Sequence, residues 1–330
     1  MNLLFTTDTH CSDQPRDAYR FGLFRWLAKQ QEKHAVDATL LLGDITERKD
    51  RHSSLLVNRI VEELLRLKPP VYILRGNHDG TDPSSPYFKF LNHIEGITFI
   101  VNPTHNKELG VSFIPHCGDQ RTFDEACKQL PQKARLLALH QTISGSRAET
   151  GATLSGLSAS PIEALKPGRV YSGDVHVPQR CGPVTYVGAP YHCRFGDNFT
   201  PRVLLLKGDR EIDLHFDCPR KFSLTVRDAD DILNSKELKP HDQVKLTIEM
   251  AREEAVEWQA IKQRVLAACR DCELEVFGAE LKIKTTARRE RVKLEEAVAT
   301  TPKDILAAFC KAEGVASNIK AAGEELLKCT

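Results

Sequence analysis

Residues 71–79 read VYILRGNHD, a short apolar run that leads into Gly76-Asn77-His78-Asp79. Similar apolar runs between polar turns occupy residues 3–5, 39–42, 97–101, 111–114, 136–139, 170–171 and 203–206. Runs of this length predict buried strands of an α/β sandwich. Residues 19–27 and 56–67 carry apolar side chains at helical spacing, which predicts helices that cover the sheets.

The character of the sequence changes near Cys218-Pro219. Residues 221–226, 243–250 and 273–284 have the pattern of strands, and residues 229–238 and 253–269 have that of helices. We therefore expect an α/β fold in three parts. A two-sheet β-sandwich flanked by helices occupies residues 1–217, a small α/β capping domain 218–287, and a linker with two C-terminal helices 288–330.

The composition is that of an ordinary globular chain. The 330 residues are 41% hydrophobic and 28% charged, which excludes a collagen, a disordered tail and a small disulfide-stapled domain. The 46 Lys and Arg residues nearly balance the 45 Asp and Glu residues, giving a formal charge of +1. Any polyanionic partner therefore has to be held by local basic patches.

Cysteine spacing and hydropathy predict a location in the cytoplasm. The ten cysteines have no regular spacing, and the CxxC at Cys269 and Cys272 has no second pair, so free thiols are expected. The first residues lack a basic region and reach Asp8 early, unlike a signal peptide. No apolar run approaches the roughly 18 residues of a membrane span, so no membrane association is expected.

Side chains of metal-ligand type follow most predicted strands of the first part. They are Asp8 and His10 after residues 3–5, Asp44 after 39–42, Asn77 and His78 after 71–74, His140 after 136–139, and Asp174 and His176 after 170–171. Two divalent ions need a bridging carboxylate and a few oxygen or imidazole ligands each. One of these motifs alone could be a polar turn. Five in this order predict a metal centre at one edge of the sandwich, and Asp44, which follows a glycine, suits the bridge.

This order of motifs resembles the calcineurin-like metallophosphoesterase superfamily. More narrowly, the chain resembles the SbcD family, the nuclease subunits of SbcCD-type double-strand-break repair complexes and their bacteriophage recombination counterparts. The narrower resemblance rests on YSGDVHVPQ at residues 171–179, on YVGAPYHCRFGD at residues 186–197, and on the small domain and helical tail after residue 218. It implies the metallophosphoesterase fold and the cytoplasm of a bacterial cell or of a phage-infected host.

The resemblance also implies roles for the ligand residues. Two sets would hold one ion each: Asp8, His10, Asp44 and His176 the first ion, and Asp44, Asn77, His140 and Asp174 the second. Both ions are expected to be Mn²⁺, with Mg²⁺ possible. No nucleotide is expected in this chain, because its sequence contains no GxxxxGK[ST].

The resemblance implies catalytic roles for two further residues. His78 would protonate the departing oxygen of a phosphodiester without binding metal. Glu47 is expected to orient His78 or to favour its protonated form, and Asp79 is the competing candidate for that role.

One position departs from the family pattern. Gly173-Asp174-Val175-His176 stands where the family has GHxH, so a carboxylate replaces an imidazole at the second ion. A carboxylate is a good ligand for hard ions, and we expect a working site with greater affinity for Mn²⁺ or Mg²⁺. The alternative is a weakly bound second ion and slow hydrolysis, because the Asp side chain is shorter.

Basic side chains near the ligand loops are candidates for contacts with a DNA backbone. They are Arg16, Arg20, Arg48, Lys49 and Arg51. A solvated charged surface is the alternative interpretation.

The C-terminal tail carries an apolar stripe that could bind a partner protein. Its members include Ile305, Leu306, Phe309, Ile319 and Leu326. The resemblance implies that these helices bind the coiled-coil base of an SbcC-type, SMC-like ATPase. Packing on the chain's own small domain is the alternative. The resemblance also suggests a homodimer through apolar residues within 87–94.

The expected function is that of a metal-dependent DNA nuclease subunit. It would hydrolyse phosphodiesters as an exonuclease and an endonuclease in DNA repair, recombination or replication, through a water molecule that two ions turn into a nucleophile. One alternative is a small-molecule phosphomonoesterase or cyclic-nucleotide phosphodiesterase. Another is a non-catalytic scaffold that bridges DNA and an ATPase.

Overall fold

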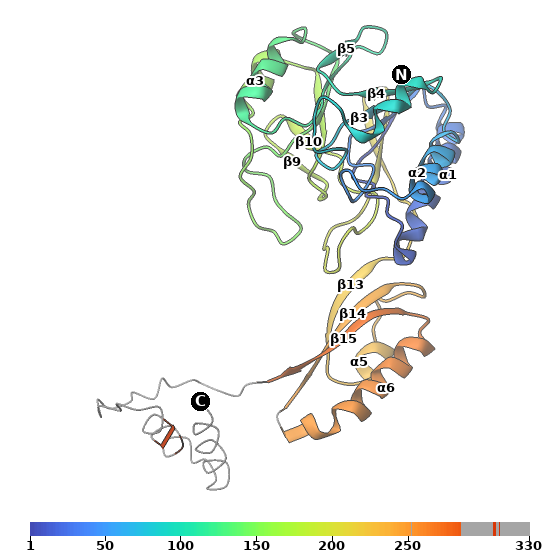
Figure 1. The fold of residues 1–330 in the computed structure, drawn as a ribbon, viewed down its shortest axis with the longest axis vertical. Helices are drawn as coiled ribbons and strands as arrows, with labels where there is room; N and C mark the ends of the chain where they lie inside the picture. Colours follow the sequence, from blue (N-terminus) through green and yellow to red (C-terminus); the bar gives the residue numbers. More distant parts are fainter. Residues whose placement is uncertain (252, 285–305, 308–309, 311–330) are drawn as a thin grey trace. The chain divides into compact units, whose positions relative to one another are not determined.

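The computed structural model describes residues 1–251, 253–284, 306–307 and 310 (Figure 1). By its internal contacts the chain forms two compact units. The first consists of Met1–Glu249 and Glu257–Lys282, and the second of Met250–Val256 and the residues from Ile283 onward. The predicted boundary at residue 217 falls inside the first unit, between two of its sheets, and stays a prediction.

A six-stranded sheet has the order β12-β11-β1-β2-β3-β4. Its strands are β1 (Asn2–Thr6), β2 (Ala38–Leu41), β3 (Val71–Leu74), β4 (Ile97–Ile100), β11 (Val203–Lys207) and β12 (Arg210–Leu214). The pairs from β1 to β4 are parallel, whereas β11 is antiparallel to β1. The carboxyl ends of β1, β2 and β3 therefore lie at the same edge of this sheet.

A second six-stranded sheet has the order β5-β6-β7-β8-β10-β9. Its strands are β5 (Thr104–Asn106), β6 (Val111–Ile114), β7 (Leu136–His140), β8 (Arg169–Gly173), β9 (Gln179–Cys181) and β10 (Val184–Tyr186). The pairs β6–β7, β7–β8 and β8–β10 are parallel. The carboxyl ends of β7 and β8 thus share an edge as well.

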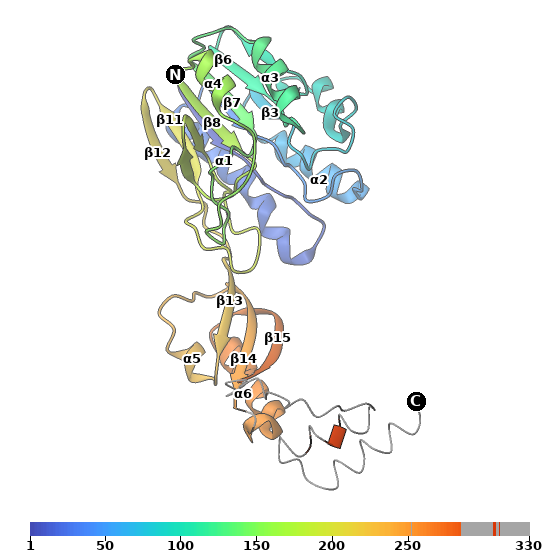
Figure 2. The same ribbon diagram turned by 90° about the vertical axis from the view of Figure 1, so that its left-hand side faces the viewer.

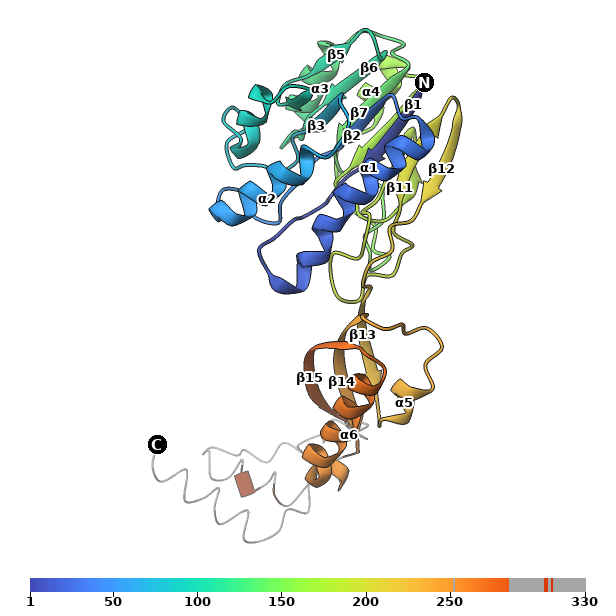
Figure 3. The same ribbon diagram turned by 90° about the vertical axis from the view of Figure 1, so that its right-hand side faces the viewer.

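The two sheets pack face to face, and helices cover their outer faces. Alternation along β1 sends Leu3 and Phe5 into the core between the sheets, while Leu4 joins the core under the helices. Helices α1 (Gly22–His34) and α2 (Ser54–Leu64) lie side by side over the first sheet (Figure 3). Helices α3 (Gln120–Lys128) and α4 (Ser160–Leu165) cover the second sheet (Figure 2). The predicted α/β class, a two-sheet sandwich flanked by helices, is confirmed.

A third sheet has three strands in the order β13-β14-β15. Strands β13 (Lys221–Val226), β14 (Gln243–Met250) and β15 (Glu275–Ile283) agree with the predicted ones. The predicted helix at 229–238 is only α5 (Asp230–Leu233), and the one at 253–269 divides into the 3-10 helix η3 (Glu253–Glu257) and α6 (Trp258–Asp271). Sequence periodicity overestimated α5 because a polar stretch gives no clear helix end.

Two 3-10 helices complete the first unit: η1 (Pro15–Phe21) and η2 (Tyr87–His93). The predicted dimer surface includes η2, but Phe88 and Leu91 are fully buried there. Only Tyr87 and Phe90 are exposed among its large apolar side chains, at 36% and 38%. Most of that apolar stretch is therefore core, and its assignment as a dimer surface is wrong for Phe88 and Leu91.

The predicted partner-binding residues Ile305, Phe309, Ile319 and Leu326 lie outside the described residues. Leu306 is described, and it is helical and half-buried. Within the described part of the chain, no helix combines the length and apolar character needed to cross a membrane.

Candidate metal centre

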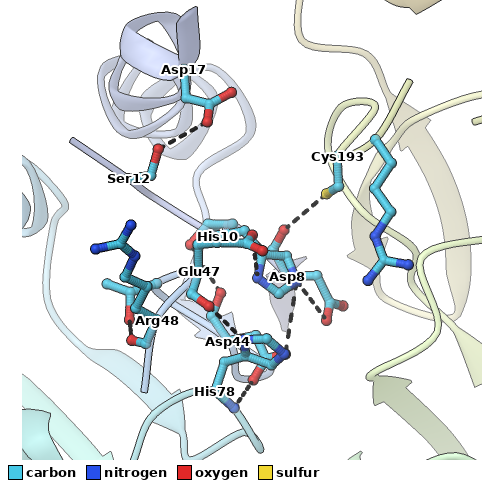
Figure 4. A network of polar contacts seen from close by, with 12 residues as sticks. Asp8, His10, Ser12, Asp17, Asp44, Glu47, Arg48, His78 and Cys193 are labelled. Atoms are coloured by element: carbon cyan, nitrogen blue, oxygen red, sulfur yellow. Dashed lines mark hydrogen bonds and ion pairs between the residues drawn. The ribbon is translucent and has the colours of Figure 1, made fainter. Parts of the chain in front are cut away.

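All seven predicted ligands meet at the edge where the strands of both sheets end. Asp8 and His10 follow β1, Asp44 follows β2 and Asn77 follows β3, while His140 ends β7, and Asp174 and His176 follow β8. Figure 4 shows Asp8, His10, Asp44 and His78 gathered there. The convergence follows from parallel pairing within each sheet, because it brings the carboxyl ends of neighbouring strands together.

The first group of ligands surrounds the imidazole of His10. Its Nε2 lies 3.2 Å from Nε2 of His176, 3.8 Å from Asp44 Oδ2 and 4.0 Å from Asp8 Oδ1. Nε2 of His176 is also 3.9 Å from Asp8 Oδ1. These four side chains correspond to the set predicted for the first ion.

The second group surrounds His140. Its Nε2 lies 3.4 Å from Asp44 Oδ1, 3.7 Å from Asp174 Oδ1 and 3.2 Å from the side-chain amide of Asn77. Asp44 therefore turns Oδ2 to the first group and Oδ1 to the second. A carboxylate that bridges two ions needs this arrangement.

Buried polar atoms without partners fit a cation at the first group. Asp8 is fully buried, and among the described residues neither of its carboxylate oxygens has a hydrogen-bond partner. Burial raises the pKa of Asp8 to about 6, although the nearby imidazoles of His140 and His176 act in the opposite direction. A cation would remove the cost of keeping this carboxylate charged in the interior.

The ligand loops adopt conformations that most side chains avoid. The φ angles of Asp8, His10, Asp44 and Asp174 are 51°, 38°, 56° and 75°, in the left-handed region. Such backbone strain is typical of functional sites held by their surroundings. The GNHD motif needs a glycine at position 76, because a Cβ there would lie 2.1 Å from Asp44 Oδ1.

Asp79 braces the loops after β2 and β3. Its fully buried carboxylate accepts hydrogen bonds from the backbone N–H groups of Asp44 and Ile45, both at 2.9 Å, and of Gly76 at 2.7 Å. The sequence offers Asp79 as the competing partner of His78, but its carboxylate accepts hydrogen bonds from backbone amides instead. Its role is to position the bridging Asp44.

His78 lies beside the ligands with its ring fixed by one backbone contact. Its Nδ1 is 2.7 Å from the carbonyl oxygen of Glu47, and its N–H donates to Asp44 Oδ1 at 2.8 Å. A carbonyl can only accept, so Nδ1 carries a proton and Nε2 is the nitrogen that can exchange one.

Glu47 does contact His78, as predicted, but through its main-chain carbonyl and not through its side-chain carboxylate. The Glu47 carboxylate is 53% exposed, and its Oε2 lies 3.5 Å from His10 Nδ1. The loop geometry presents the main-chain carbonyl to His78, a contact that the sequence cannot reveal.

Two residues of the second sheet's loops support ligands, and the sequence analysis missed both. Glu149 Oε1 lies 2.8 Å from His176 Nδ1, a contact that lowers the pKa of Glu149 to about 2. Burial lowers the pKa of His176, but Glu149 and Asp8 outweigh it and raise that pKa to about 9. Thr142 Oγ1 donates to Asp174 Oδ2 at 2.6 Å. Such outer contacts orient metal ligands.

Arg20 does not contribute to a DNA-binding surface, so that prediction is wrong. Its side chain is only 2% exposed, and its guanidinium donates to the backbone carbonyls of His10 and Cys193 and pairs with Asp17 at 3.1 Å. Lys221 of β13, also buried, reaches Asp17 Oδ1 at 2.8 Å. This buried network holds the loop that carries His10.

A pocket of about 670 Å³ opens over the metal centre. Its lining contains ligand residues, His78 and five exposed basic side chains, which we call the basic rim: Arg16, Arg48, Arg51, Arg194 and Lys245. The predicted Arg16, Arg48 and Arg51 are thus gathered at the site. Lys49 is exposed and lines a neighbouring hollow instead.

Comparison with known proteins agrees with this geometry. Residues 1–140 match the family model described as calcineurin-like phosphoesterase. A solved structure described as a novel archaeal phosphodiesterase is 16% identical, with a TM-score of 0.36, and the match covers 65% of this chain and 100% of that one. No protein of curated function matches the chain. Residues 1–140 are thus similar to calcineurin-like phosphoesterases, and the converging ligands of the site agree with this similarity.

Proposed function

We propose that this protein is a dinuclear metal-dependent nuclease that hydrolyses DNA phosphodiesters. The single observation that carries the hydrolytic part is the split carboxylate of Asp44, which turns one oxygen to each group of ligands. When bound, the two ions would supply an activated water and offset the charge of the phosphate. Asp8, His10, Asp44 and His176 would hold one ion, and Asp44, Asn77, His140 and Asp174 the other.

His78 would serve as the general acid. Its Nδ1 proton is engaged with the Glu47 carbonyl, so Nε2 is the atom that can deliver a proton to the departing sugar oxygen. The Asp44 contact to its backbone N–H keeps His78 in register with the bridging carboxylate.

A nucleic acid substrate is supported by the basic rim. Five exposed Arg and Lys side chains line the same pocket as the ligands, while the whole chain has a formal charge of only +1. Basic side chains concentrated there can track phosphates on either side of the scissile bond. A phosphomonoester would not need this number of cationic groups.

We further propose that the chain works in an SbcCD-like complex of DNA repair or recombination, with Mn²⁺ as the metal. The apolar tail residues Ile305, Leu306, Phe309, Ile319 and Leu326 would bind the coiled coil of an SMC-like ATPase. The support is the resemblance of the motifs at residues 171–179 and 186–197.

The test is a Mn²⁺ assay on four substrates: end-labelled linear duplex DNA, a bis-aryl phosphodiester, an aryl phosphomonoester and a cyclic nucleotide. The proposal predicts cleavage of DNA and of the diester, with Asp44→Asn inactive on both. Activity on the monoester or the cyclic nucleotide alone would instead favour a small-molecule phosphatase or phosphodiesterase. If Asp44→Asn retained the DNA cleavage, the site would not be catalytic.

A further inference from the structure

Cys193 lies against the first group of ligands. A ring nitrogen of His10, a ring nitrogen of His176 and the Cys193 sulfur all lie within 4.8 Å of one another. In Figure 4 the Cys193 side chain points toward the segment of Asp8 and His10, and its Sγ is 3.8 Å from the Asp8 carbonyl oxygen. Three groups that bind metal through nitrogen or sulfur thus face one point.

The segment that carries Cys193 is held in place by buried cations. The Cys193 carbonyl accepts hydrogen bonds from Arg20 Nη2 at 3.2 Å and from Lys221 Nζ at 3.4 Å. Both cationic side chains are 2% exposed. The thiol therefore belongs to a fixed part of the site, as a metal ligand must.

A second observation points to a cation at the same place. The Asp8 carboxylate is fully buried and lacks a hydrogen-bond partner among the described residues, and its Oδ1 lies about 4 Å from both imidazoles of this cluster. A buried carboxylate beside the same two imidazoles that lie near the Cys193 sulfur fits a bound metal ion.

The two groups of ligands differ in chemical softness. The first offers carboxylates, two imidazoles and a sulfur, whereas the second offers Asp44, Asn77, Asp174 and only the imidazole of His140. Sulfur and imidazole ligands favour Zn²⁺ and Co²⁺, and oxygen ligands favour Mn²⁺ and Mg²⁺.

We propose that Cys193 is a thiolate ligand of the first ion, which makes that position selective for a thiophilic ion such as Zn²⁺ or Co²⁺, while the oxygen-rich second position takes Mn²⁺ or Mg²⁺. The thiol proton passes to solvent when the ion binds. This inference rests on the metal centre of the proposed function and is independent of DNA as the substrate.

Cobalt reports sulfur ligation directly. We expect that Co²⁺ added to the metal-free full-length protein produces an intense near-ultraviolet thiolate-to-cobalt charge-transfer band at one equivalent. In Cys193→Ser this band should vanish, and Co²⁺ affinity should fall by at least about tenfold, since even the loss of an outer contact costs that much. The matched control is Cys181→Ser, at a half-exposed thiol in β9, which should keep the band.

A second measurement needs no variant. X-ray absorption at the cobalt edge of the wild-type protein should detect one sulfur at about 2.3 Å. When Mn²⁺ is added in increasing excess to the cobalt-loaded wild type, the second position should exchange first, so the charge-transfer band should persist after one cobalt ion has been displaced. A wild type without the band and without a sulfur neighbour, or a Cys193→Ser variant that keeps the band, would overturn the assignment. Because none of these readouts uses DNA, a failure of the nuclease proposal would leave this result interpretable.

Discussion

The ligand cluster and the basic rim share one pocket but are built in opposite ways. Asp8, Asp44 and His140 are at most 3% exposed at the ends of neighbouring strands, and Asp79 fixes the loop of Asp44. The side chains of the rim are exposed to solvent, as those of Arg16 and Arg48 are. Substitutions in the buried cluster should therefore abolish most of the catalytic activity. Substitutions in the rim should lower the affinity for DNA by small amounts that depend on the salt concentration.

The largest effect is expected at the bridge. Asp44→Asn removes the charge that both groups of ligands share, so turnover with Mn²⁺ should fall by about 10³-fold or more. Steady-state rates on duplex DNA and on a bis-aryl phosphodiester measure the loss. Arg121→Gln, on the exposed face of α3, is the matched surface control and should leave both rates unchanged.

His78 should follow, with a dependence on the leaving group. His78→Ala should slow DNA cleavage by about 10²- to 10⁴-fold, because the sugar oxygen needs a proton as it departs. An aryl leaving group needs less protonation, so the loss on a bis-aryl phosphodiester should be smaller. Equal losses on both substrates would contradict the role of His78 as general acid.

Glu47→Ala distinguishes the contribution of the Glu47 main-chain carbonyl from that of its carboxylate. The substitution keeps the carbonyl that bonds to His78 Nδ1, so DNA cleavage should fall by less than about tenfold, below the usual contribution of a general acid or base. A loss as large as that of His78→Ala would show that the carboxylate itself is the partner.

The buried network beneath the cluster affects stability. Arg20→Met removes one of the two cations that balance the buried negative charge of Asp17. Breaking a buried ion pair of this kind lowers the free energy of unfolding by about 3–5 kcal/mol. Chemical denaturation of the metal-free protein measures this, with the exposed Arg121→Met as control. If the two variants unfold alike, the network is not a structural support.

The rim should give the smallest change. In Arg48→Gln/Arg51→Gln, the slope of log affinity for duplex DNA against log salt should decrease in magnitude by about 2, close to one unit for each lost phosphate contact. Hydrolysis of a bis-aryl phosphodiester should stay at the wild-type rate. An unchanged salt slope would remove these arginines from the DNA-binding surface.

The same contrast explains what the sequence could predict. Short apolar runs gave the strands of the sandwich, and ligand types after those runs gave the cluster, because parallel strand ends must share an edge. The sequence could not show that Arg20 is buried, since the Cys193 carbonyl that it binds is 173 positions away and the Lys221 that shares Asp17 with it is 204 positions from Asp17. Glu149 sits on a loop without periodicity, and its contact with His176 depends on tertiary structure alone.

Anomalous diffraction tests the Asp44 bridge on crystals of the metal-free protein soaked in excess Mn²⁺, which can fill both positions because no thiophilic ion competes for the first. A bridging Asp44 predicts two manganese peaks about 3.5–4 Å apart, one on each side of its carboxylate. One should be surrounded by Asp8, His10 and His176, and the other by Asn77, His140 and Asp174. A single peak, or no peak beside the Asp44 carboxylate, would contradict the shared bridge on which the proposed hydrolysis depends.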